Sequence, residues 1–84
     1  MSHKLLILRR AERELDRLPT DALEQIKQAL KGLATDPRPR GSVKLTHRHG
    51  WRIRVGDYRV IYEIDDSRRS VTLIHIGHRR DVYR

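Results

Sequence analysis

Residues 51–62, with the sequence WRIRVGDYRVIY, constrain the fold of this chain more than any other stretch. Apolar residues recur at every second position on both sides of a central Gly-Asp pair, with an arginine at three of the four positions between them. Successive side chains of a β-strand point to opposite faces, so the pattern predicts two strands joined by a tight turn. The face expected to seal a core carries Trp51, Ile53, Val55, Tyr58, Val60, Tyr62 and Ile64.

The opposite face of this hairpin is expected to carry Arg52, Arg54 and Arg59, together with Ile61 and Glu63. Exposed strand faces are commonly polar, so a solvated surface is one interpretation. Three arginines at neighbouring positions repel one another, however, and only Glu63 is placed to balance them. A bound anion relieves this repulsion, and the pattern therefore favours an anion-binding face.

Periodicity predicts a strand and two helices before the hairpin. A strand is expected over residues 4–8, because residues 5–8 form a continuous apolar run, which is typical of a short strand covered on both sides. A first helix is expected over residues 9–18. A second begins after Thr20 as its N-cap and ends near Ala34, because the following Asp-Pro pair disfavours helical backbone. The apolar stripes of the two helices are Ala11, Leu15 and Leu18, then Leu23, Ile26, Leu30 and Leu33.

Further strands are expected at residues 43–45, 58–64 and 71–76. The Pro-Arg-Pro-Arg-Gly loop at 37–41 is either an exposed connector or a phosphate contact. Short links between the later strands imply antiparallel pairing, and helices grouped at one end of a sequence cover one sheet face. The predicted fold class is therefore α+β: an N-terminal strand, then an antiparallel helical hairpin packed on one face of a small antiparallel sheet. We expect a single domain over residues 1–84.

Positive charge is concentrated in the second half of the chain. Lys and Arg number 19 against 11 Asp and Glu, and residues 37–84 hold twelve of the basic and five of the acidic residues. Arginine outnumbers lysine by 15 to 4, and guanidinium groups favour planar, bidentate contacts with phosphate. The bias predicts a polyanionic partner, most simply nucleic acid, with a solvated basic surface or the arginine usage of a GC-rich genome as the alternative.

Three absences in the sequence point to a cytoplasmic protein without membrane contact. There is no cysteine and no signal-peptide pattern. No apolar run approaches the roughly 20 residues of a membrane span.

The residue types also limit the chemistry of the arginine face. The sequence offers no serine–histidine–acid arrangement and no carboxylate pair, and His47 and His49 lack a third ligand at metal spacing. No metal or other cofactor is expected. Phosphoryl transfer needs mainly positioning and charge stabilisation, and RNA supplies its own 2′-hydroxyl nucleophile. His75, His78 and Tyr83 are candidates for the acid or base, and Tyr83 is alternatively a platform for an unpaired nucleobase.

Two segments resemble motifs of the RelE/ParE superfamily of bacterial toxins, and of its RelE branch in particular. They are residues 56–63, GDYRVIYE, and residues 77–83, GHRRDVY, and the likeness extends over the whole chain. It implies a ribosome-dependent endoribonuclease that cuts mRNA in the ribosomal A site, leaving a 2′,3′-cyclic phosphate and a 5′-hydroxyl. It also implies contacts with the ribosome (16S rRNA) and inhibition by a RelB-like antitoxin, which either covers the basic cleft or docks on the helices and displaces the C-terminal tail.

The same resemblance implies roles for individual residues. Arg52 and Arg54 stand where well-known members carry lysines, and Arg59 matches an arginine that opens the next strand. Arg79 matches a residue proposed as acid or leaving-group stabiliser, and Tyr83 matches one proposed to orient or deprotonate the nucleophile. Arginine at position 54 preserves the charge but weakens any role as a base, which shifts proton transfer to Tyr83 or a histidine. Further RNA contacts are expected from Lys44, Arg48, His78 and Arg80.

Two other functions stay open at this point. A ParE-like toxin that inhibits DNA gyrase without cleaving RNA shares the fold, although that branch generally lacks this set of arginines and tyrosine. A nonenzymatic or degenerate member, acting only as an antitoxin or a nucleic-acid binder, is the third possibility.

Overall fold

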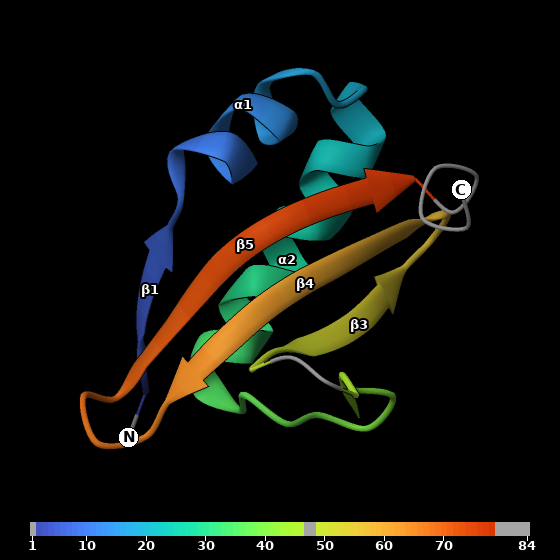
Figure 1. The fold of residues 1–84 in the computed structure, drawn as a ribbon. Helices are drawn as coiled ribbons and strands as arrows, with labels where there is room; N and C mark the ends of the chain where they lie inside the picture. Colours follow the sequence, from blue (N-terminus) through green and yellow to red (C-terminus); the bar gives the residue numbers. More distant parts are fainter. Residues whose placement is uncertain (1, 47–48, 79–84) are drawn as a thin grey trace.

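The computed structural model describes residues 2–46 and 49–78. Within them lie β1 (Lys4–Ile7), α1 (Arg9–Asp16), α2 (Thr20–Thr35), β2 (Val43–Lys44), β3 (Trp51–Val55), β4 (Tyr58–Asp65) and β5 (Ser70–His78). The strands form one sheet in the order β1-β5-β4-β3-β2. In Figure 1, α2 lies behind this sheet and α1 lies beside β5, so neither helix covers the face toward the viewer, here named the open face. The predicted α+β fold is confirmed.

Strand directions match the prediction from β2 to β5 and differ at β1. Neighbouring strands from β2 to β5 pair antiparallel, as their short links require. β1 instead pairs parallel with β5, with Lys4 opposite Ser70 and Ile7 opposite Leu73. A parallel pair needs a long connection, and the helices and the three middle strands together provide it.

The expectation that β1 is covered on both sides is wrong. Leu6 and Ile7 are 41% and 40% exposed, and Leu8, just after the strand, is 45% exposed. β1 lies at the edge of the sheet, next to β5 alone. A short apolar run does not distinguish a central strand from an edge strand.

The core lies between the helices and the sheet. It comprises Ala11 from α1, Ile26, Leu30 and Leu33 from α2, Val60 and Tyr62 from β4, and Val71, Leu73 and Ile76 from β5. Trp51, Ile53, Val55, Tyr58 and Ile64 pack against this core, which confirms the predicted core face of the hairpin. Full burial of each large aliphatic side chain contributes about 1.5–3 kcal/mol to stability.

The helix ends differ slightly from the predicted ones. α1 ends at Asp16, because the N–H groups of Arg17 and Leu18 donate to carbonyls three residues back and tighten the last turn. Thr20 is wrong as an N-cap, since it is the first helical residue of α2. Pro19 precedes it, and the Pro19 carbonyl accepts the first bond of the helix from the Leu23 N–H at 2.9 Å.

A buried hydrogen bond fastens the loop after α2 to the sheet. The Tyr62 side chain is fully buried, and its hydroxyl donates to the Pro37 carbonyl oxygen at 2.8 Å. Burial raises the pKa of the Tyr62 hydroxyl, although Ser42 and Arg38 oppose the shift. The neutral phenol is therefore the form that the folded chain holds.

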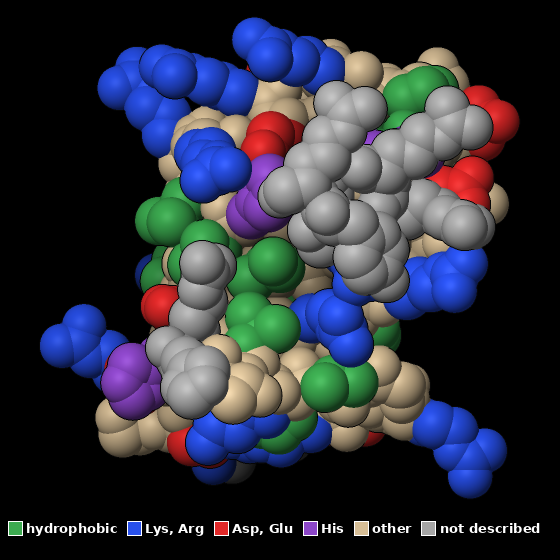
Figure 2. Space-filling model, turned by 45° about the vertical axis from the view of Figure 1, so that its right-hand side comes forward, with side chains coloured by type: hydrophobic (Ala, Val, Ile, Leu, Met, Phe, Trp, Pro, Cys, Tyr) green, Lys and Arg blue, Asp and Glu red, His purple; other side chains and the backbone are tan. Residues whose placement is uncertain are grey.

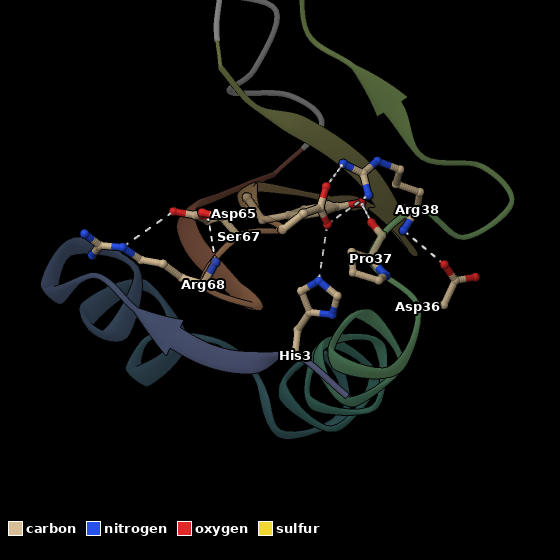
Figure 3. Close-up of polar contacts among 9 residues, drawn as sticks. His3, Asp36, Pro37, Arg38, Asp65, Ser67 and Arg68 are labelled. Carbon is tan, nitrogen blue, oxygen red and sulfur yellow. Dashed lines mark hydrogen bonds and ion pairs between the residues drawn. The ribbon is translucent and has the colours of Figure 1, made fainter. Parts of the chain in front are cut away.

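An ion pair fastens the same loop to the turn between β4 and β5 (Figure 3). The Arg38 guanidinium donates to Asp66 Oδ2 at 2.9 Å and lies 5.2 Å from the centre of the Trp51 ring. His3 Nε2 lies 3.4 Å from the other oxygen of Asp66, so Asp66 joins the loop to the N-terminal segment. The bond to Arg38, followed by that to His3, lowers the pKa of Asp66. Arg38 thus supports the connector interpretation of this loop.

Candidate functional site

Three arginines meet on the open face of the sheet. Arg54 lies directly opposite Arg59 in the register of β3 and β4, and Arg52 lies opposite Ile61. Directly opposite residues of an antiparallel pair share a face, and the core-facing residues of both strands alternate with these. A hollow of about 210 Å³ lies among the side chains, here named the arginine hollow, and it is lined by Gly41, Val43, Arg52, Arg54 and Arg59.

The turn at Gly56 sets this register. The φ angle of Gly56 is +60°, in the left-handed region that glycine adopts without steric cost. A Cβ atom at this position would lie 3.1 Å from Gln25 Oε1 of α2, so the turn packs closely against the helix. Arg54 Nε donates to the Gly56 carbonyl oxygen at 3.1 Å, which directs the Arg54 side chain along the turn.

The electrostatics of the arginine hollow favour an anion. Among the described residues that line it, none is acidic. Arg54 and Arg59 are directly opposed like charges, an arrangement that destabilises an antiparallel pair. Guanidinium groups bind phosphate oxygens in a planar, bidentate geometry. The hollow is therefore suited to hold a phosphate group and to stabilise negative charge that develops on it.

The other predicted site residues lie apart from this hollow or outside the described residues. Lys44 lies opposite Trp51, in register with a core-facing residue. His78 lies opposite Tyr58, and the two rings meet edge to face with centroids 5.2 Å apart. Neither Lys44 nor His78 lines the arginine hollow. Arg48, Arg79, Arg80 and Tyr83 lie outside the described residues.

His75 lies on the same row of the sheet as Arg52, across the intervening Ile61. Its Nδ1 atom is 2.6 Å from Oε2 of Glu14 in α1, and Glu14 Oε1 accepts a hydrogen bond from the Ile76 N–H at 3.0 Å. The 2.6 Å distance places the carboxylate beside the ring without a well-aligned hydrogen bond to Nδ1. Sequence reasoning missed Glu14, because no local spacing relates two residues more than sixty positions apart.

Two further hollows adjoin each other, and both are lined by His49, Gly50 and Glu63. The first, here named the apolar hollow, has a volume of about 270 Å³ and is lined by Leu45, His49, Gly50, Ile61, Glu63 and Ile74. The second, of about 530 Å³, lies toward the β4–β5 turn and includes Trp51, Asp65 and Asp66 in its wall. Figure 2 shows hydrophobic side chains near the middle of the molecule, with Lys and Arg side chains beside them and around the rim.

Neither a metal site nor a membrane helix emerges from the described part of the chain. Across residues 2–46 and 49–78, no group of three His, Asp or Glu side chains is arranged to hold a metal ion. Neither α1 nor α2 is long and apolar enough to cross a membrane.

Comparison with known proteins identifies relatives over most of the chain. Residues 5–83 match the family model described as "ParE toxin of type II toxin-antitoxin system, parDE". Toxin RelE of Mycobacterium tuberculosis is 37% identical over 76 residues, which are 88% of this chain and 78% of that protein. Toxin RelG of the same organism is 33% identical over 76 residues, covering 88% of this chain and 87% of RelG.

The fold is also found among solved structures. The archaeal RelE–RelB complex from Pyrococcus horikoshii contains a chain that superposes with a TM-score of 0.84 at 25% sequence identity, covering 94% of this chain and 97% of that one. A small α+β toxin is thus the class that fold and sequence define. The chain belongs to the RelE/ParE superfamily and is a toxin of a type II toxin–antitoxin system.

Proposed function

We propose that this toxin is a ribosome-dependent endoribonuclease that cleaves mRNA in the ribosomal A site and so inhibits translation. The observation that carries the proposal is the arginine hollow, because three arginine residues line it on a face that neither helix covers. The similarity to mycobacterial RelE and RelG supports the RelE branch. An open, positively charged sheet face also suits entry of a single RNA strand.

In this mechanism the RNA provides the nucleophile and the protein provides positioning and charge. The 2′-oxygen forms a bond to the adjacent phosphorus and loses its proton, while the bond from phosphorus to the next 5′-oxygen breaks and that oxygen gains a proton. Arg52, Arg54 and Arg59 hold the phosphate and stabilise its extra negative charge in the transition state. Arginine keeps its own proton, so it does not act as the base.

Proton transfer falls to groups outside the arginine hollow. Following the family resemblance, we assign charge stabilisation of the leaving 5′-oxygen to Arg79 and deprotonation of the 2′-hydroxyl to Tyr83, and the leaving oxygen takes its proton from solvent. His75 is the alternative base, because it lies on the same row of the sheet as Arg52 and its ring lies against Glu14. Lys44, Arg48, His78 and Arg80 are then left to contact RNA or 16S rRNA beyond the scissile phosphate.

A RelB-like antitoxin is the partner that we propose for this toxin, in the cytoplasm. The Pyrococcus horikoshii structure of similar fold is a RelE–RelB complex. A positively charged face invites an acidic or amphipathic chain that folds as it binds.

Inhibition of DNA gyrase is the second candidate function, because the matching family model carries the ParE description. Mapping the 5′ ends of cellular mRNA after toxin induction separates the two. Cuts confined to translated regions, and lost when translation is blocked, support the endoribonuclease. Intact mRNA together with DNA-damage signalling supports the gyrase inhibitor instead.

Binding of purified toxin to single-stranded RNA tests the arginine hollow directly. Each phosphate contact contributes about 0.7 to the slope of log affinity against log salt concentration. Arg52→Gln is expected to weaken binding and to reduce that slope by about 0.7. Arg13→Gln, an exposed change of equal charge on α1, serves as the control. Equal slopes for both variants would remove the arginine hollow from the RNA-binding surface.

A further inference from the structure

The apolar hollow and the arginine hollow adjoin on the open face. Ile61 lines the apolar hollow, Arg52 lines the arginine hollow, and the two residues are direct cross-strand partners. Side chains in such a pair have Cβ atoms about 4.5–5.5 Å apart. A phosphate held by the arginines therefore lies about one nucleotide's width from an apolar recess.

The size and lining of the apolar hollow fit one planar ring system. Its volume of about 270 Å³ corresponds to roughly nine water molecules, comparable to the number of non-hydrogen atoms in a nucleobase. Leu45, Ile61 and Ile74 provide apolar walls. Gly50 is buried, and a Cβ there would lie 3.2 Å from Leu45 Cδ1 and so narrow the recess.

Glu63 is the acidic residue among the described lining of the apolar hollow. It lies two residues along β4 from Ile61, at the end away from the arginine hollow, and it also lines the 530 Å³ hollow with Arg38, Lys44 and Arg68. Within residues 2–46 and 49–78, no hydrogen bond or ion pair engages the Glu63 carboxylate. Its negative charge repels a phosphate but accepts hydrogen bonds from the neutral edge of a base.

We propose that the apolar hollow receives one nucleobase of the bound RNA and that Glu63 selects guanine there. The proposal rests on the proposed function, since it places the phosphate of the same nucleotide in the arginine hollow. Guanine carries two adjacent N–H donors on its Watson–Crick edge, which match the two oxygens of one carboxylate. In adenine, cytosine and uracil a donor on that edge stands next to an acceptor, and the acceptor repels the carboxylate.

A ribosome-free titration tests the inference. Protein-observed NMR with the 3′-monophosphates of guanosine, adenosine, cytidine and uridine gives the four dissociation constants. Wild-type toxin is expected to bind 3′-GMP about five- to 150-fold more tightly than 3′-UMP, the discrimination of one bidentate base contact. Glu63→Ala is expected to equalise the four constants, with the largest shift changes still at Ile61 and Ile74. Glu24→Ala, the matched loss of an exposed carboxylate on α2, keeps the preference.

Two results would overturn the assignment: equal binding of the four nucleotides by wild-type toxin, or a guanine preference that survives in Glu63→Ala. Circular dichroism of both variants establishes that they fold alike. Failure of the proposed function looks different, because guanine selection is then retained while cellular mRNA stays intact after induction.

Discussion

Replacing Tyr62 with phenylalanine removes one hydroxyl from the interior and nothing else. That hydroxyl donates to the Pro37 carbonyl oxygen at 2.8 Å, and the Tyr62 side chain is fully buried. The substitution leaves the buried carbonyl without its partner, which costs about 1–3 kcal/mol of folding free energy. For a domain of this size, the melting temperature falls by about 4–8 °C for each kcal/mol lost.

Thermal unfolding followed by circular dichroism measures this loss. Tyr58→Phe is the matched control, because Tyr58 is only half-buried and its ring meets His78 by its edge. The control is expected to change stability by less than about 0.5 kcal/mol. If Tyr62→Phe were no more destabilising than Tyr58→Phe, the buried bond to Pro37 would have no energetic weight and the reasoning would fail.

Alkaline pH provides a second measurement on the same variant. Burial raises the pKa of Tyr62 above its ordinary value of 10.0. The unfolded chain therefore releases this proton first as the pH rises. The stability contributed by the neutral phenol is complete below pH 10 and is lost as the pH rises through the raised pKa. Tyr62→Phe should show a weaker loss of stability over this range.

Two further predictions concern the turns. The pKa of Asp66 is lowered from 3.8, so its contribution to folding stability is present above that value and is lost as the pH falls through the lowered pKa. Asp66→Asn should therefore flatten the acid dependence of stability, measured as urea unfolding midpoints from pH 6 to pH 2. Gly56→Ala places a side chain at a φ of +60° and should lower the free energy of unfolding by about 1–2 kcal/mol. Gly32→Ala in α2, where a Cβ meets nothing within 4 Å, should instead stabilise the protein in the same melting experiment. A neutral Gly56→Ala would show that the turn relaxes without strain.

The two faces of the hairpin were predictable because they depend on a period of two residues. Once Val60 and Tyr62 face the core, Arg59 and Ile61 must face away, whatever the rest of the chain does. The grouping of Arg52, Arg54 and Arg59 follows from the same parity. Local turn chemistry at Gly56 then fixes the register.

Contacts between distant segments were not predictable in this way. Glu14 reaches His75 only because β1 ends beside Leu73 and α1 then packs along the rest of β5. Pro37 and Tyr62 meet because of how a loop crosses the sheet. No periodicity in the sequence carries this information, since it depends on the relative placement of whole elements. The apolar hollow was missed for the same reason, as its described walls come from β4, β5 and the segment that connects β2 with β3.

Trp51 is the single tryptophan of the chain, and the guanidinium of Arg38 lies over its ring. Indole emission depends on the polarity around the ring, so this residue is a built-in optical probe of the loop that Arg38 belongs to. Detachment of that loop changes the emission even while the helices and the sheet stay folded. A fluorescence transition that precedes the circular dichroism transition therefore measures how firmly one wall of the 530 Å³ hollow is held.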